Sequence, residues 1–310
     1  QKKSSRIHFI DFARGIAIIM MLQGHFISLT LEDYGLLTSS SQTNENLSFS
    51  IWLTLRGFTA PLFFTVSGMV FAFTLMKMHE FPFYKNPRVI KGLKRAISLI
   101  IIGYLLQLNV SNIDYYLAGK LNDRFFAFHV LNSIGLGLII LIFIYVLFIK
   151  TLKLNSIISY LFFAFSFLIF SVYITSIEGY FPSESPVIIQ NVLKGPNSIF
   201  PIVPWVSYIL VGAALGSFLY QKRTVVKGRW FPLILATSSL IILQFMKWMM
   251  DLVEYFANSE LVFLNSQYAL TQLMYIILFI SLLIYLEKLL KPDMILLKMG
   301  QNTLTIYVLH

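Results

Sequence analysis

The stretch IDFARGIAIIMMLQGHFISL, residues 10–29, is apolar enough to cross a membrane, yet it carries Asp11, Arg14, Gln23 and His25. Of the 310 residues of the chain, 57% are hydrophobic and 12% are charged, and the mean hydropathy is +0.75. These values lie outside the usual range of soluble proteins and indicate an integral membrane protein. The ionisable groups of this first segment therefore need an explanation in terms of a membrane environment.

Apolar runs of about 20 residues, the helical length that crosses a hydrocarbon core, recur along the whole chain. We predict an all-α, polytopic membrane helix bundle of about nine spans, forming one transmembrane domain over residues 1–310. The ninth span is short, and we expect the domain to continue beyond His310. The predicted spans are residues 9–31, 57–77, 93–110, 130–150, 156–176, 201–220, 230–250, 267–287 and 296–310.

The loops between these spans alternate in charge, and this alternation predicts the orientation. The N-terminus and the even loops are rich in lysine and arginine, whereas the first, fifth and seventh loops carry mainly acidic residues. The positive-inside rule then assigns the N-terminus and the even loops to the cytoplasm. The net charge of +10 is explained as a property of the cytoplasmic face, so we expect no nucleic-acid partner. The absence of cysteine excludes disulfide and thiol chemistry.

Helical geometry places two of the ionisable groups of the first span on one stripe. The eleven residues from Arg14 to His25 turn about 1100°, so the two side chains share a face and lie about 16 Å apart along the axis. Asp11 joins this stripe and Gln23 points elsewhere. We favour a structural role for Asp11, as the partner of Arg14 between packed helices. Arg14 and His25 together fit a track for an anionic molecule that enters from the cytosol, and the alternative is that His25 is a packed core histidine.

The sequence RIHFIDFARGIAIIMMLQGH, residues 6–25, resembles the first span of the heparan-α-glucosaminide N-acetyltransferase-like family. The spacing of an arginine, ten residues and a histidine also resembles larger bacterial membrane acyltransferase families that modify extracytoplasmic sugars. This chain has no histidine in its first outer loop, where eukaryotic members place theirs, so His25 follows the bacterial pattern. Further stretches that match in order are FTAPLFFTVSGMVFAF (58–73), LKRAISLIIIGYLL (93–106), HVLNSIGLGLIIL (129–141), FPIVPWVSYILVGAALG (200–216) and GQNTLTIYVLH (300–310).

The resemblance implies a transmembrane acyltransferase of the bacterial cytoplasmic (inner) membrane. It would take an acyl group, expected to be acetyl, from cytosolic acetyl-CoA and pass it to an extracytoplasmic or lipid-linked saccharide, with membrane lipid around it. His25 would act either as general base or as acyl carrier, and the sequence does not choose between these roles. The expected binding residues for the CoA phosphates are Arg14, Lys94, Arg95 and Lys298.

Two polar residues of the last predicted span are further catalytic candidates by depth and by resemblance. Asn302 could donate to a developing oxyanion, as could Thr303, Tyr307 or Trp205. His310 lies at a depth similar to that of His25, and it is either a second member of the site or a packing residue. The sequence leaves both roles open.

Three residues at the outer face are candidates for acceptor binding, each with a simpler alternative. Arg56 could meet an acceptor or anchor a helix end in the headgroup region. Trp205 could contact the acceptor, although an aromatic belt position is favoured, and His129 is favoured as an interfacial histidine without a role.

A transporter or flippase for a saccharide or an anionic metabolite is the alternative function, since a polar stripe can also line a permeation path. We find no similarity between the two halves of the chain, which is common in transporters. A purely structural membrane subunit would leave the alignment of Arg14 and His25 unexplained. We expect no metal site, because the sequence contains no histidine pair at i, i+4 and no HExxH element. The oligomeric state stays open, with a homodimer as one alternative.

Overall fold

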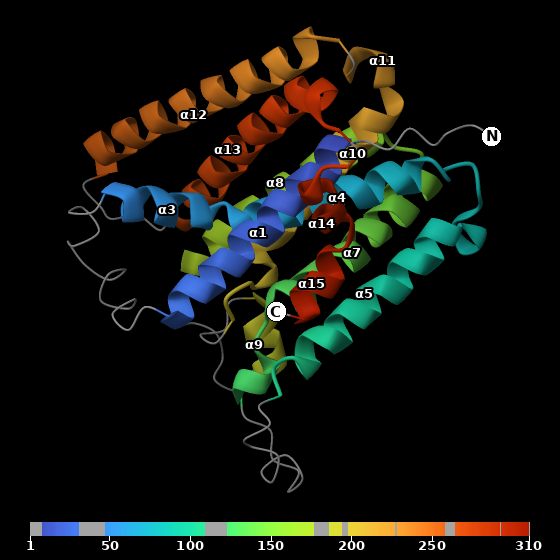
Figure 1. Ribbon diagram of the computed structural model, residues 1–310, viewed down its shortest axis with the longest axis horizontal. Coiled ribbons are helices and arrows are strands. Elements are labelled where there is room, and N and C mark those ends of the chain that lie inside the picture. The colour runs from blue at the N-terminus through green and yellow to red at the C-terminus, as the bar shows by residue number, and fades with distance from the viewer. Residues whose placement is uncertain are drawn as a thin grey trace, which may run out of the picture. The chain divides into compact units, whose positions relative to one another are not determined.

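All regular elements in the part of the chain that the structure describes are helices, which confirms the all-α prediction. The computed structural model shows two compact units, and helices α4, α12 and α13 contribute residues to both (Figure 1). Unit 1 comprises Gln1–Val66, Gly228–Leu243 and Gln272–His310, and unit 2 comprises Ser67–Lys227 and Gln244–Thr271. The described residues are 8–30, 47–108, 123–176, 186–193, 198–226, 228–257, 264–291 and 293–309.

The helices follow the predicted spans over most of their length. Those of unit 1, or shared with it, are α1 (His8–Thr30), α3 (Leu47–Gly57), α4 (Thr59–Met76), α12 (Trp230–Ala257), α13 (Leu264–Leu286), α14 (Ile295–Gln301) and α15 (Thr303–Leu309), with the short turn η6 (Glu287–Leu289). Those of unit 2 alone are η2 (Phe83–Lys85), α5 (Pro87–Leu105), η4 (Asp123–Phe126), α7 (Val130–Ile144), the π-helix η5 (Tyr145–Thr151), α8 (Ser156–Ser176), α9 (Val187–Leu193), α10 (Ile202–Gln221) and α11 (Arg223–Val226).

Six segments are helical, long and apolar enough to cross a membrane, and each overlaps a predicted span. A seventh predicted span is the helix α8, whose apolar part covers Ser156–Ser171. These helices confirm the polytopic membrane architecture. The six segments are His8–Thr30, Leu47–Met76, Val130–Thr151, Ile202–Gln221, Trp230–Trp248 and Tyr268–Leu286.

Three predicted spans differ from the observed helices. The span expected over residues 57–77 begins at Leu47, because the additional helix α3 precedes α4. The span expected to begin at residue 93 begins at Pro87, because the side chain of Asn86 accepts hydrogen bonds from the backbone N–H groups of Arg88 and Val89 and so caps the helix. The span expected over residues 296–310 is divided into α14 and α15. Asn302 separates them with a non-helical backbone (φ −112°, ψ 23°), and its side-chain amide donates to the carbonyl of Lys298.

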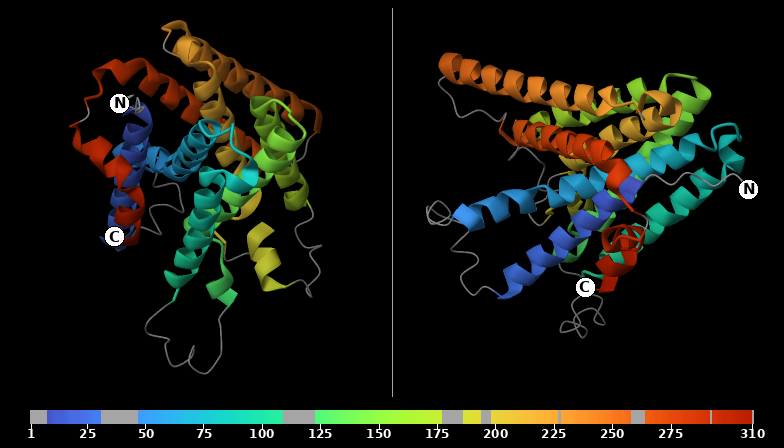
Figure 2. Two further views of the ribbon diagram at one scale, coloured as in Figure 1. Left: turned by 90° about the vertical axis from the view of Figure 1, so that its right-hand side faces the viewer. Right: turned by 45° about the horizontal axis from the view of Figure 1, so that its top comes forward.

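In unit 1, α1 and α14 cross with their backbones in direct contact. A Cβ atom on Gly15 would overlap the carbonyl group of Leu296, and one on Gly300 would overlap that of Asp11. Two glycines facing each other in this way allow an approach that no other residue type permits, as is common between membrane helices. Figure 2 shows α14 and α15 along α1 in both views.

In unit 2, α4 and α10 are in contact in the same manner. A Cβ atom on Gly68 would overlap the carbonyl of Ile209, and one on Gly216 would overlap that of Met69. Helices α5 and α7 are joined by a polar contact in addition, since the Asn132 amide donates to the carbonyl of Ile100 (3.3 Å). Small residues and single buried amides therefore hold the helices of this unit together.

The α1–α14 contact predicts a strong effect of one methyl group. Gly300→Ala places a Cβ against the backbone of Asp11, which cannot move like a flexible side chain, and overpacking of this kind costs about 1–3 kcal/mol or more. We expect a clearly lower midpoint of thermal unfolding in detergent. Ile19→Ala, at an exposed position of α1, is the control and should change the midpoint little. Equal midpoints for the two variants would contradict the close backbone contact.

Candidate functional site

The N-terminal half of α1 holds Arg14 in a network with two polar neighbours. Arg14 Nη2 donates a hydrogen bond to Thr303 Oγ1 of α15 (2.5 Å), and Arg14 Nη1 lies 3.9 Å from Asp11 Oδ1. Asp11 and Thr303 are buried, and Arg14 is partly buried. The guanidinium is therefore oriented from two sides: Asp11 contacts it within α1, and Thr303 binds it from α15.

The C-terminal half of α1 carries His25, and the helix between the two residues is unbroken. Since α1 runs from His8 to Thr30, Arg14 and His25 share a face about 16 Å apart along the axis, as expected from the spacing. The side chain of His25 is exposed, and its backbone carbonyl accepts a hydrogen bond from Ser28 Oγ (2.9 Å). His25 is thus a surface group of unit 1 rather than a packed core histidine.

Arg56 of α3 lies against α1 at Gly24, the residue before His25 in the chain. Its side chain covers Gly24, where a Cβ atom would come within 2.9 Å of Arg56 Nε. The guanidinium carbon lies 5.6 Å from the centre of the Trp52 ring, within the range of a cation–π contact. Unit 1 therefore places Arg56 against the segment of α1 that carries His25.

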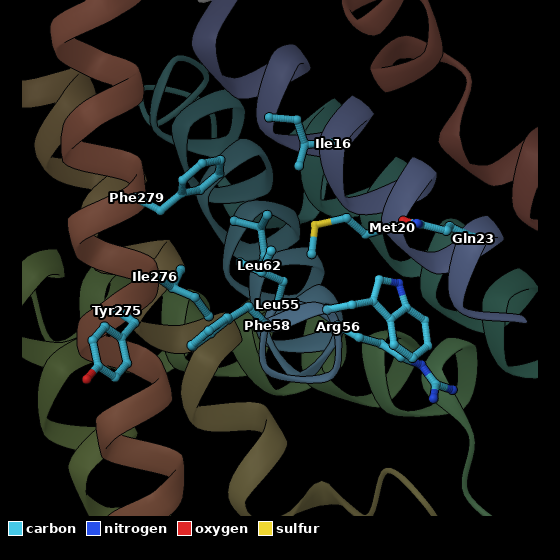
Figure 3. Close-up of a pocket in the computed structure, with 11 residues that line it drawn as sticks. Ile16, Met20, Gln23, Leu55, Arg56, Phe58, Leu62, Tyr275, Ile276 and Phe279 are labelled. Atoms are coloured by element: carbon cyan, nitrogen blue, oxygen red, sulfur yellow. The ribbon is translucent and has the colours of Figure 1, made fainter. Parts of the chain in front are cut away.

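A cavity of about 460 Å³, lined in part by Arg56, lies entirely within unit 1. Ile16, Met20 and Gln23 of α1 line one side of it, and residues of α3, α4 and α13 line the rest (Figure 3). The guanidinium of Arg56 points away from the apolar centre of the cavity. Its volume is in the range of small-molecule sites, about 300–1,000 Å³, and its lining is mostly apolar with few polar groups, as in such sites.

Two further candidates of unit 1 lie in and directly after α14. Asn302 and Lys298 are exposed, and the Asn302 amide is used within its own turn. Lys298 lies in the last turn of α14, one turn before Asn302. His310 lies outside the described residues.

The candidates in unit 2 occupy separate places. Lys94 and Arg95 are exposed on the N-terminal half of α5. Trp205 packs edge-on against Phe200 (4.7 Å between ring centres) and near Tyr208 (5.5 Å), which fits a role in aromatic packing.

His129 also belongs to unit 2, where it is the N-cap residue of α7. It caps the helix without a hydrogen bond from its side chain. Burial lowers the pKa of its imidazole, so the neutral form is favoured. In the described part of the chain, no three His, Asp or Glu side chains lie together as metal ligands.

Sequence reasoning missed the residues that surround the main candidates. Thr303 was considered only as an oxyanion donor, whereas it binds Arg14. The sequence gives Gln23 no role, because its side chain points away from the Arg14–His25 stripe. In the structure Gln23 lines the 460 Å³ cavity. Gly24 could have been noticed as a small residue next to His25, since a glycine in a helix interior often marks a close approach.

The family model described as "Heparan-alpha-glucosaminide N-acetyltransferase, catalytic" matches residues 6–246 of the chain. The matched part includes Arg14, His25 and Arg56, and it ends before α14 and α15. No curated protein and no solved structure matches the chain.

The Arg14–Thr303 bond predicts a measurable loss of stability. Thr303→Val keeps the shape of the side chain but removes the acceptor of a charged donor, a bond worth about 1.5–3 kcal/mol. We expect a lower unfolding midpoint than for Thr305→Val, which changes an exposed threonine on the same short helix. If the two variants unfold alike, the bond contributes nothing to the stability of unit 1.

Proposed function

The chain belongs to the heparan-α-glucosaminide N-acetyltransferase catalytic family, and from this premise we propose that it moves an acetyl group from cytosolic acetyl-CoA to an extracytoplasmic or lipid-linked saccharide. The family match over residues 6–246 is the observation that carries this proposal. The helices are those of an integral membrane protein, as transfer across a bilayer requires.

The donor end of the reaction needs cations for the CoA phosphates. Within unit 1 we assign this role to Arg14 and Lys298. Lys94 and Arg95, the other two cations that the sequence suggests for it, belong to unit 2. Arginine suits phosphate because its planar fork can donate two parallel hydrogen bonds. Arg14 is supported further by Thr303 and Asp11, which hold its guanidinium in one orientation. The positive-inside rule assigns this end of α1 to the cytoplasm.

The transfer step would take place at His25. The acceptor oxygen or nitrogen attacks the thioester carbonyl, the imidazole of His25 takes the proton of the acceptor, and the carbon–sulfur bond breaks to release CoA. In the second form of the mechanism, the imidazole itself attacks the carbonyl and passes the acetyl group to the acceptor afterwards. The axial distance of about 16 Å from Arg14 is close to the length of an extended pantetheine arm, on the order of 15–20 Å.

The acceptor would be met by Arg56 and the cavity beside it. Arg56 supplies charged donors next to Gly24, which suits hydroxyl groups or the phosphate of a lipid-linked sugar. The apolar lining of the 460 Å³ cavity suits the lipid part of such an acceptor, and Gln23 adds a polar group on its wall.

The central test replaces the imidazole. His25→Ala should abolish the release of free CoA when the purified protein is given acetyl-labelled acetyl-CoA and a panel of amino sugars, because neither proton removal nor acetyl capture remains. His8→Ala is the matched control, since it removes a histidine at the other end of the same helix and should retain turnover. Unchanged turnover in His25→Ala at an unchanged unfolding midpoint would refute the assignment of this residue.

The two forms of the mechanism and the transport alternative give different results in the same preparation. Label retained on the protein in the absence of acceptor indicates an acetylated His25, and its absence indicates direct transfer. Saccharide uptake into vesicles without any dependence on acetyl-CoA would replace the enzyme by a transporter.

A further inference from the structure

A second cavity, of about 410 Å³, lies within unit 2 where the ends of four helices and two loops meet. Its polar lining comes from the loop after α4, the end of the π-helix η5, the loop between η5 and α8, the start of α8 and the end of α10. The charge pattern assigns these two loops, the second and the fourth, to the same side of the membrane as the loop that follows α10. We call this cavity the basic pocket, and its polar residues are His79, Lys150, Lys153, Asn155, Ser156 and Gln221.

The backbone around the basic pocket is irregular in a way that positions its lysines. The segment Tyr145–Thr151 is a π-helix, and the N–H of Leu152 bonds the carbonyl of Leu147 (3.0 Å), five residues before it. Lys150 Nζ then donates to the carbonyl of His79. Lys153 has a left-handed backbone (φ 55°), which is uncommon for a residue with a side chain. Local irregularities of this kind are frequent at functional sites.

Positive charge is concentrated near the basic pocket. Lys77 precedes His79 in the same loop, and burial together with the charges of Arg223 and Arg88 lowers the pKa of its ammonium group. Burial and the charge of Lys150 likewise lower the pKa of His79. The acidic residue of this loop, Glu80, is exposed. The charged forms of these side chains repel one another, and an anion bound among them would stabilise those charged forms.

An apolar surface adjoins the pocket on α8. Leu154 lines the pocket and is 50% exposed, and Ser156 begins α8 from the pocket wall. Along α8 the exposed side chains Ile158, Phe162, Phe165 and Ile169 recur at helical spacing, so they form one stripe. A membrane helix exposes such a stripe to lipid chains.

We propose that the basic pocket binds the phosphate headgroup of an anionic phospholipid, whose acyl chains lie along the exposed stripe of α8. Basic pockets between membrane helices on the cytoplasmic side bind lipid headgroups of this class. The apolar surface distinguishes this ligand from a free phosphate, because a soluble anion makes no use of it. The basic pocket contains none of the residues assigned to acetyl transfer. A negative result for lipid binding would therefore leave the proposed function unaffected, and the reverse also holds.

Binding can be measured on the whole protein in phosphatidylcholine nanodiscs with increasing phosphatidylglycerol. The wild type should gain thermal stability as phosphatidylglycerol is added. The variant Lys150→Gln/Lys153→Gly should bind it about thirtyfold more weakly, at roughly fivefold per cation near an anionic surface. Glycine at position 153 tolerates the left-handed backbone, so this change removes the charge without adding strain.

A matched control removes two lysines outside the pocket. Lys85→Gln/Lys291→Gln has the same net charge as the test variant, and both residues are exposed. It should keep the stabilisation, as should Lys150→Arg, which retains a cation. If loss of Lys150 prevents folding, Lys153→Gly alone should still reduce binding by about fivefold.

Three outcomes would overturn the proposal. The test and control variants could respond to phosphatidylglycerol alike, which would reduce the effect to net charge. Inorganic phosphate could stabilise the wild type as well as the lipid does, which would identify a soluble anion as the ligand. Acetyl-CoA could displace the lipid from the wild type but bind weakly to the test variant, which would identify the donor as the occupant.

Discussion

The direct backbone contact between α1 and α14 is the constraint on which the candidate site in unit 1 depends. Gly15 and Gly300 bring the two helices close enough for α15 to follow directly with Thr303 against Arg14. A larger residue at either glycine would separate the helices and leave the guanidinium without its buried acceptor. The position of Arg14 relative to Thr303 is therefore governed by two residues that have no side chain.

Much of the architecture could be predicted from the sequence because hydrophobic length and loop charge are strong local signals in a membrane protein. Six long apolar helices and the common face of Arg14 and His25 follow from such signals. The break at Asn302 could not be predicted, because it depends on a turn that the residue closes with its own amide. The exposure of the His25 side chain could not be predicted from the sequence either, because it depends on which helices pack against α1 and where those helices end.

The surroundings of Arg56 depend on residues of different kinds. Arg56 lies against α1 because Gly24 leaves room for its side chain, and Trp52 provides an aromatic face for the guanidinium. Neither feature is periodic, so no hydrophobic pattern indicates it. The sequence indicates candidate residues by their chemical type and by their depth in the membrane. Which of these candidates come into contact is decided by tertiary packing.

The π-helix at Tyr145–Thr151 has a consequence for how this chain can be compared with its relatives. A π-helical turn holds one residue more than an α-helical turn, so deletion of a single residue in this segment would restore a regular helix. Such a deletion would change the backbone path that leads to Lys150 and Lys153 at the end of this segment. The presence of the lysine pair in a related sequence is therefore informative only where the length of this segment is the same. A one-residue gap at this segment in an alignment would therefore indicate that the two lysines do not occupy the same positions in both proteins.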